Sequence, residues 1–336
     1  MDGNPALKRA IAAMYQKEMD RDFEPDAIIP SIGAIGANYA FLYAHIKRGD
    51  HVISQYPSWQ QLGSVPKSLG AEVTLWETSM DNGWQLDPED LKAMIRPETK
   101  MIILNNPQNP TGAVLSQRSL QAIVDIAKEK DIYILCDEVF RALVHGLPET
   151  DLPPSILSFN YSKSAVVSSM SKAYSLAGLR VGWIASENPE IIKACLSARD
   201  YTTVSVSKIC EGITTYALNP SVGPHVVEYN IATARRNLDH LSAFVEKHKD
   251  VCSWVKPRAS STAFVLFKDK TGQPVDDAKF CKDLQDATGV MTVPGGYSFG
   301  NEYKGFVRIG YIGETDDFVK GLKVFSDWLD REKAEL

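Results

Sequence analysis

The chain is organised around Ser168–Trp183, which reads SSMSKAYSLAGLRVGW. This stretch places Lys172 among small hydroxyl residues after an apolar run, and Arg180 at the start of an apolar strand predicted over 180–185. A crowded lysine loses its proton more easily than a free one, and a neutral amine can form a Schiff base with a carbonyl group. The hydroxyls of Ser169 and Ser171 and a guanidinium suit phosphate oxygens. The same string also fits a lysine in an ordinary turn, so only the rest of the sequence can distinguish a reactive lysine from a structural one.

Composition narrows the class of protein. The 336 residues carry 36 Lys and Arg against 42 Asp and Glu, a net charge of -6, without a basic stripe of the kind that nucleic-acid binding needs. No apolar run approaches a membrane span, and the first 30 residues lack the order of a signal peptide. The five cysteines lie far apart, and neither they nor the histidines form a metal-binding pattern. We therefore expect a cytoplasmic protein with no metal, no nucleic acid and no membrane partner.

The predicted elements alternate in the first two thirds of the chain. Apolar strands are predicted at 27–31, 51–54, 72–75, 101–104 and 132–136, and helices at 6–15, 39–46, 88–95 and after Ser116. Such alternation predicts an α/β fold with a mostly parallel sheet flanked by helices on both faces. After residue 219 the pattern changes to a long helix at 224–248, strands at 263–267 and 306–311, and helices at 276–287 and from 314 onward. We therefore predict a large domain over 1–218 and a smaller α+β domain over 219–336.

Three places at predicted strand ends carry polar chemistry. Gly33–Asn38 is a predicted turn before a helix, where free backbone N–H groups favour an anion, although the glycines also fit a plain tight turn. The turn does not match G-x-G-x-x-G, which disfavours a dinucleotide. Asn105–Gly112 leaves a strand as a loop with two prolines, either of which could be cis. Asp137 ends the strand 132–136, where a carboxylate is either a turn residue or the partner of a cationic ring nitrogen.

In chain order, these motifs together resemble the class I/II aminotransferases, the pyridoxal-phosphate enzymes with the aspartate aminotransferase fold. The motifs are the Gly33 turn, Trp59, Asn109-Pro110-Thr111-Gly112, Asp137, Ser169-x-Ser171-Lys172, Arg180 and Arg308. The resemblance covers nearly the whole chain. It implies fold type I of the pyridoxal-phosphate enzymes, a homodimer, and transfer of the amino group of an L-amino acid to a 2-oxo acid.

The resemblance also implies a role for each matching residue. Lys172 would carry pyridoxal 5'-phosphate as a Schiff base and move the Cα proton, and Asp137 would pair with the ring nitrogen. Asn109 would bind the ring hydroxyl oxygen and lie next to the substrate, Trp59 would stack on the ring, and Arg308 would bind the substrate α-carboxylate. The phosphate would be held by Ala34, Ile35, Ser169, Ser171 and Arg180. Outside this set, each residue also has an ordinary explanation, such as core packing for Trp59 or an ion pair for Arg180.

Three departures from the family pattern matter. The usual Asp-x-x-Tyr string reads Asp137-Glu138-Val139-Phe140, so the phenol that would donate to the ring oxygen is replaced by Phe140 in the cofactor site. We expect a more basic ring oxygen and a raised pKa of the Schiff base as a result.

The sequence starts after the segment that would hold the substrate-covering arm and a tyrosine reaching the neighbouring subunit's phosphate. Ile35 stands where relatives often have a polar residue and can offer only its backbone N–H, so we expect a slightly weaker phosphate grip.

Two alternatives remain open from the sequence. One keeps the cofactor but changes the reaction to that of an amino-acid oxidase, hydroxylase, cyclase or lyase, and Phe140 is the feature behind it. The other is an aminotransferase-like ligand-sensing domain of a transcription regulator. Such regulators carry a basic winged-helix segment before this domain, and the sequence begins almost directly on the predicted helix at 6–15. The substrate side chain cannot be assigned, because Arg141, Arg199 and Tyr201 are equally well surface residues.

Overall fold

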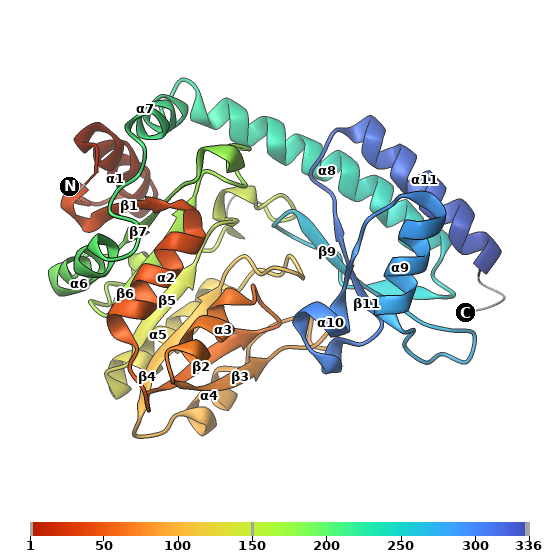
Figure 1. Ribbon diagram of the computed structural model, residues 1–336, viewed down its shortest axis with the longest axis horizontal. Helices are drawn as coiled ribbons and strands as arrows, with labels where there is room; N and C mark the ends of the chain where they lie inside the picture. Colours follow the sequence, from red (N-terminus) through yellow and green to blue (C-terminus); the bar gives the residue numbers. More distant parts are fainter. Residues whose placement is uncertain (1–2, 149–150, 333–336) are drawn as a thin grey trace.

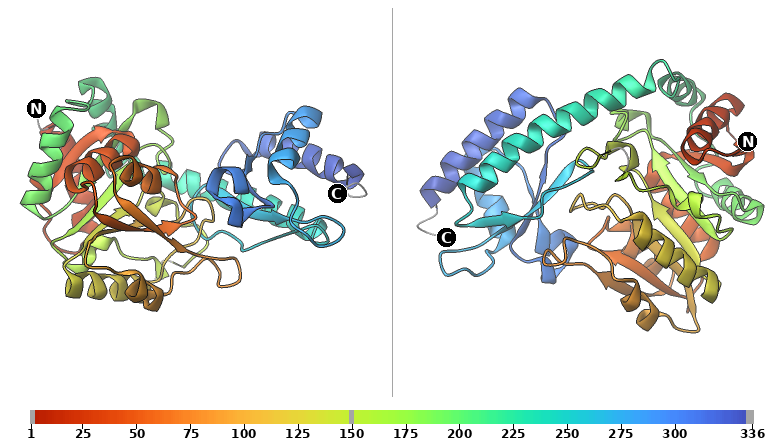
Figure 2. Two further views of the ribbon diagram at one scale, coloured as in Figure 1. Left: turned by 60° about the horizontal axis from the view of Figure 1, so that its bottom comes forward. Right: turned by 180° about the vertical axis from the view of Figure 1, so that it is seen from behind.

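The computed structural model describes residues 3–148 and 151–332 in two parts connected by one long helix, α8 (Figure 1). The first two residues of the predicted large domain and the last four of the predicted small domain lie outside the described residues, as do residues 149–150. Seen from two further sides in Figure 2, the parts remain side by side, and α8 (Gly223–Lys247) reaches from one to the other.

The larger part is built on a seven-stranded sheet with the order β1-β7-β6-β5-β4-β2-β3. Its strands are β1 (Ile28–Ile32), β2 (His51–Tyr56), β3 (Glu72–Glu77), β4 (Thr99–Asn105), β5 (Tyr133–Asp137), β6 (Ser164–Ser169) and β7 (Val181–Ala185). The pairs among β2 to β6 are parallel, whereas β7 runs antiparallel to both β6 and β1. The predicted mostly parallel sheet is confirmed, with β7 as the reversed strand.

Both faces of this sheet are covered by helices because its central strands are apolar throughout. In β4, Ile102 and Leu104 belong to one apolar core, and Met101 and Ile103 belong to the core on the opposite face. This follows from the two-residue period of a strand. The first core is completed by α1 (Pro5–Met19), α4 (Pro88–Met94) and α5 (Gln117–Lys130), and the second by α2 (Gly33–His45), α3 (Gln61–Ser68) and α6 (Pro189–Asp200). The short helix α7 (Lys208–Ala217) packs against α1.

The smaller part has its own sheet and core. Its antiparallel strands lie in the order β10 (Val293–Pro294), β11 (Phe306–Gly310), β9 (Thr262–Phe267) and β8 (Cys252–Trp254). Helices α8, α9 (Asp277–Thr288) and α11 (Thr315–Glu332) cover this sheet, and α10 (Gly295–Phe299) follows β10. Phe267, Phe280 and Phe325 form an aromatic centre, with ring centroids 4.7 to 6.1 Å apart. The predicted α+β unit is therefore present.

The contacts between the two parts include one aromatic cluster and one backbone bridge. In the cluster, Trp84 from the β3–α4 connection is buried against Phe264 and Phe306 of the smaller sheet, with ring centroids 5.8 and 5.6 Å away. The bridge is an isolated antiparallel one between Val144 and Ala259. The contacts hold the two parts in a defined arrangement around the space between them.

Two predicted boundaries are wrong by a few residues, and both concern the site. The predicted turn Gly33–Asn38 is instead the beginning of α2, which starts at Gly33 rather than at 39. Arg180 does not lie on the predicted strand but just before β7, in the left-handed conformation with φ of 52°. In both cases the chain turns sharply at the strand end, and hydrophobic periodicity does not report such turns.

No described helix is long and apolar enough to cross a membrane. No group of three His, Cys, Asp or Glu side chains in the described ranges is arranged so that it could hold a metal ion.

Candidate active site

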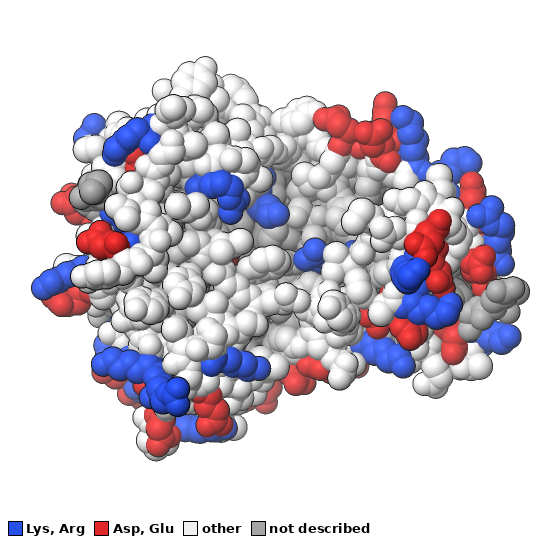
Figure 3. Space-filling view, viewed as in Figure 1, with Lys and Arg blue, Asp and Glu red and all other residues white. Residues whose placement is uncertain are grey.

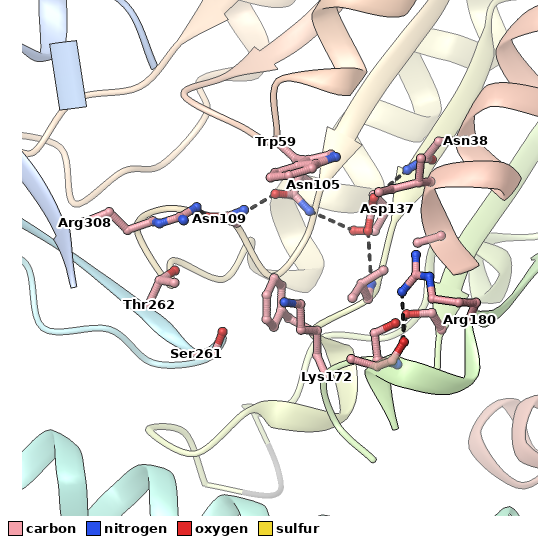
Figure 4. A pocket seen from close by; sticks show the side chains of 17 residues that line it. Asn38, Trp59, Asn105, Asn109, Asp137, Lys172, Arg180, Ser261, Thr262 and Arg308 are labelled. Atoms are coloured by element: carbon pink, nitrogen blue, oxygen red, sulfur yellow. Dashed lines mark hydrogen bonds between the residues drawn. The ribbon is translucent and has the colours of Figure 1, made fainter. Parts of the chain in front are cut away.

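A pocket of about 370 Å³ lies between the two parts, at the carboxyl ends of the parallel strands. Every residue predicted for the site lines it: Ala34, Ile35, Trp59, Asn109, Asp137, Phe140, Ser169, Ser171, Lys172, Arg180 and Arg308 (Figure 4). On the face seen in Figure 3 the molecule is hollowed between the two parts, and Lys and Arg side chains gather near this hollow while most Asp and Glu side chains lie at the edges. The electrostatics of this hollow favour an anionic guest.

Lys172 follows β6 at a turn and extends into the pocket. Partial burial, followed by the charges of Arg308 and Arg180, lowers the pKa of the Lys172 amine. Loss of solvation and nearby positive charge both disfavour the ammonium form, so they act in the same direction. The arrangement therefore favours a neutral, nucleophilic amine more than the surroundings of a fully solvated lysine do.

Asp137 is the last residue of β5 and is almost fully buried, with 4% of its surface exposed. Its carboxylate accepts hydrogen bonds from Asn38 Nδ2 at 2.8 Å and from the Val139 N–H at 3.2 Å. No cation among the described residues forms an ion pair with it, and burial raises the pKa of Asp137 to about 6. A buried carboxylate without a cation costs free energy, so this side chain is prepared for a positively charged or proton-bearing partner in the pocket.

Asn109 and Arg308 meet across the pocket, although they come from different parts of the fold. Arg308 Nη1 on β11 donates to Asn109 Oδ1 at 3.2 Å. This bond fixes the orientation of the Asn109 amide, whose NH₂ group is then free to donate to an oxygen in the pocket. The Arg308 guanidinium also lies 5.6 Å from the centre of the Phe299 ring, and burial lowers its pKa. Both contacts hold a cationic fork in place for a carboxylate.

The opposite end of the pocket is an anion cradle, formed by the first turn of α2 and by Arg180. The Gly33 N–H donates to the Arg180 carbonyl at 3.0 Å, which brings the helix start and the arginine together. A Cβ at Gly33, where φ is 65°, would lie 2.7 Å from Arg180 Nη2, and one at Gly182 would lie 2.7 Å from the Ala34 nitrogen. Only glycine allows this approach at both positions. Ser169 and Ser171 add hydroxyls, so the cradle offers hydroxyls, a guanidinium and a helix N-terminus to a phosphate.

Two aromatic side chains border the space between the cradle and Arg308. Trp59 lies across one side of the pocket in Figure 4, and 38% of its surface is exposed. Phe140 is buried and packs with Leu143 and Ala173 while also lining the pocket. No tyrosine is among the described residues that line this pocket, so no phenol of this chain replaces the one that Phe140 lacks.

The pocket also contains residues that the sequence did not single out. They are Asn38, Asn105, Val139, Ala177, Ser261 and Thr262. Asn105 opens the Asn-Pro loop, so its place at the strand end was visible in the sequence, and its Oδ1 accepts from the Asn109 N–H at 2.9 Å. Asn38 could be found only by placing the start of α2 at Gly33. No sequence pattern indicates that Ser261 and Thr262 line the pocket, because their position depends on how the smaller sheet packs beside the larger part.

Comparison with protein families gives one match that covers most of the chain. The model of the family described as Aminotransferase class I and II matches residues 1–322.

Individual relatives agree with this match. An aspartate/prephenate aminotransferase of Thermus thermophilus is 29% identical, over 98% of this chain and 82% of the relative. A capreomycidine synthase of Streptomyces vinaceus is 27% identical, over 97% of this chain and 79% of the relative. Among solved structures, a PLP-dependent aminotransferase of Streptococcus suis superposes with a TM-score of 0.88 at 38% identity, covering 98% of this chain and 82% of that one.

Proposed function

This chain belongs to the class I and II aminotransferases, and we propose that the pocket between its two parts is where the transfer takes place. The protein is a pyridoxal-phosphate-dependent aminotransferase with an amino acid and a 2-oxo acid as substrates. The observation that carries the proposal is the convergence of Lys172, Asp137, Arg180 and Arg308 on one pocket. Together these residues offer an amine, a buried carboxylate and two carboxylate- or phosphate-binding forks.

The residues fit the cofactor on features of this structure. The glycine-dependent cradle at Gly33 and Arg180 suits a phosphate, and the buried carboxylate of Asp137 suits a protonated ring nitrogen. When bound, pyridoxal phosphate supplies an aldehyde that condenses with amines and a ring that accepts electrons from the neighbouring carbon. Asp137 would keep the ring nitrogen protonated, and Trp59 would cover one face of the ring.

The protein residues would then position the substrate and move its proton. Arg308 binds the α-carboxylate of the amino acid, because its guanidinium is held toward the pocket by Asn109 and Phe299. Lys172 would take a proton from the substrate Cα and return it to the carbon that carried the cofactor's aldehyde, and its lowered pKa favours the neutral amine that this step requires. The NH₂ group of Asn109 would donate to the ring hydroxyl oxygen, while its carbonyl oxygen accepts from Arg308.

The substitution Lys172→Ala tests this assignment with the largest expected effect. We expect loss of all turnover and of the visible cofactor band, with the fold retained, since the amine is the group that reacts. The rate of amino-group transfer would be measured with aspartate, the donor suggested by the relatives' names. Absorption spectra would report the bound cofactor, and thermal unfolding would show whether the fold is retained. The matched control is Lys193→Ala on the exposed side of α6, which should leave the rate unchanged. Wild-type turnover in Lys172→Ala would refute the assignment.

Phe140 supports one variation of this reaction. Without a phenol at the ring oxygen, the fate of the substrate carbanion is less tightly set, and a relative of this chain is a capreomycidine synthase. Product analysis under air and under nitrogen would separate transamination from oxidation of the amino acid. A 2-oxo acid formed at the same rate in both atmospheres supports transamination, and a product that appears only in air indicates an oxidase.

We also propose that the protein is a homodimer with a large domain over 1–218 and a small domain over 219–336. The outward side of α7 supports the dimer, because Ile209, Ile213 and Tyr216 are 75%, 43% and 69% exposed. An uncovered apolar helix face is typical of a subunit interface. The separate cores on either side of α8 support the domain division. Sedimentation analysis of the wild type and of Ile213→Asp should give a dimer and a weakened dimer, respectively.

A cytoplasmic location is supported by the cysteines. Cys136, Cys195, Cys210 and Cys281 carry free thiols, and four of the five cysteines are buried in the apolar interior. Reduced, buried thiols are typical of proteins from a reducing compartment. Fractionation of the producing cells, with a cytoplasmic enzyme as reference, would test the location.

A further inference from the structure

The short connection from β2 to α3 carries Trp59 to the edge of the pocket. We call residues 57–60 the Trp59 loop. Both Trp59 and the neighbouring Gln60 are exposed, so the packing of the loop alone leaves the indole free to shift. The position of the ring therefore depends on the hydrogen bonds that hold the loop.

Two glutamine amides hold the loop and the start of α3 to the larger part. Gln108 Nε2, from the buried Asn-Pro loop, donates to the Pro57 carbonyl at 2.6 Å. Gln61 Nε2, at the start of α3, donates to the carbonyl of Ile35 in the first turn of α2 at 2.8 Å. The first bond leads to the segment that presents Asn109, and the second leads to the phosphate cradle. These two bonds thus fix the loop and the start of α3 to the part of the pocket that is proposed to hold the cofactor.

A third amide reaches the smaller part. Gln60 Nε2 donates to the carbonyl of Ser298 in α10. The next residue is Phe299, whose ring faces the guanidinium of Arg308, and α10 packs against β11, which carries Arg308. A continuous set of contacts therefore runs from Arg308 through Phe299 and Gln60 to Trp59.

We propose that Gln60 is a positioning residue that transmits carboxylate binding at Arg308 to the indole of Trp59. A carboxylate on Arg308 changes the charge next to Phe299 and draws the smaller part toward the pocket, which moves Ser298 and, through Gln60, the ring. Gln108 holds the first residue of the loop and Gln61 holds the start of α3, so the displacement is concentrated on Trp59 between them. The inference rests on the proposed function, because it takes Arg308 as the carboxylate site and Trp59 as the cofactor's neighbour.

The experiment uses the complete protein loaded with pyridoxal phosphate and propionate as a carboxylate without an amine. Propionate is titrated while the visible circular dichroism of the bound cofactor is recorded, since this signal reports the asymmetric surroundings of the ring. In the wild type we expect the signal to change on binding. In Gln60→Ala we expect the change to disappear and the affinity for propionate to fall about two- to tenfold, the range of one neutral hydrogen bond.

A double-mutant cycle separates transmission from a general structural effect. If Gln60 acts through the indole, Gln60→Ala should change propionate affinity by less than about twofold when Trp59 is already Phe. The matched control is Gln121→Ala, which removes a glutamine hydrogen bond to Asp125 on the exposed side of α5 and should leave the response intact. A full response in Gln60→Ala, or effects of the two substitutions that simply multiply, would overturn the proposal. The visible absorption band of the cofactor depends on Lys172 rather than on Gln60. Absence of this band in the wild type would therefore overturn the proposed function, whereas a normal band with an unchanged response in Gln60→Ala would overturn only the role of Gln60.

Discussion

The two halves of the pocket differ in how their residues are held. The cofactor half takes Asp137, Lys172 and Arg180 from the ends of three adjacent strands, β5, β6 and β7, and the sheet register fixes their relative positions. The substrate half takes Arg308 and Thr262 from the second sheet and Ser261 from the residue before it, and the place of this sheet depends on contacts between the two parts. The reacting groups thus lie along one sheet, whereas the groups that recognise the substrate belong to the other part of the fold. Substitutions in the two halves should accordingly give different kinetic signatures.

The largest effect after Lys172→Ala is expected for Asp137→Asn in the cofactor half. This change removes the charge but keeps the shape, so kcat should fall about 100- to 1,000-fold with little change in KM, as for the loss of one electrostatic stabiliser. Steady-state kinetics with saturating cofactor would measure it. The control is Asp125→Asn on the outer side of α5. A loss of less than tenfold would show that the buried carboxylate is not coupled to the reaction.

The same carboxylate should make the stability of the cofactor-free protein depend on pH. Burial raises the pKa of Asp137 from its ordinary value of 3.8 to about 6, so the folded protein holds this proton more tightly than the unfolded chain. Its contribution to stability is complete below about pH 4 and is lost as the pH rises toward 6, with a size on the order of 3 kcal/mol. Asp137→Asn should therefore gain stability relative to the wild type over this range, measured by urea unfolding of the cofactor-free proteins. A stability difference that does not vary between pH 4 and pH 7 would contradict it.

In the substrate half, Arg308→Lys should change binding rather than cofactor content. A lysine keeps the charge but loses the bidentate fork and the contact with Asn109, so KM for the amino acid should rise about 10- to 100-fold. The visible band of the cofactor should stay as in the wild type. Arg236→Lys on the exposed side of α8 is the matched control. A loss of bound cofactor in Arg308→Lys would show that the two halves are not separable.

The smallest expected effect is spectroscopic and concerns the border between the halves. Phe140→Tyr should place a phenol near the ring oxygen, where one charge-assisted hydrogen bond is worth about 1.5–3 kcal/mol. Because the bond stabilises the deprotonated Schiff base, its pKa should fall by about one to two units. A pH titration of the visible absorption would measure this shift. A Tyr variant with the wild-type pKa would mean that the phenol does not reach the ring.

The difference between the halves also decided what the sequence could predict. The residues proposed for the cofactor follow apolar strands or mark strand ends. The strand pattern therefore predicted Lys172, Asp137 and the loop with Asn109 beyond strand ends, which is where they lie in the structure. Arg308 was predicted through the family resemblance, because an arginine on an alternating strand looks like a surface residue. Ser261 and Thr262 were missed because no local pattern records the docking of one sheet beside another.

Some elements of the fold were missed for a similar reason. Helices α6 and α7 were not predicted, although the Asn188 side chain caps α6 by accepting from the Glu190 N–H. The start of α2 was placed six residues late because the first turn, Gly33–Asn38, is rich in glycine and alanine and lacks an apolar period. Tertiary packing against β7 and Arg180 forms this turn instead.

The reversed strand β7 has a consequence for synthesis of the protein. Among the described strands, the edge strand β1 pairs only with β7, and residues 28–32 must wait for residues 181–185, about 150 positions later in the chain. During translation the N-terminal segment therefore leaves the ribosome long before its partner exists, with the apolar side chains of Ile28 and Ile29 uncovered. The strand that places Arg180 in the cradle thus also closes the sheet, so a nascent chain acquires the phosphate site only when its first strand is covered.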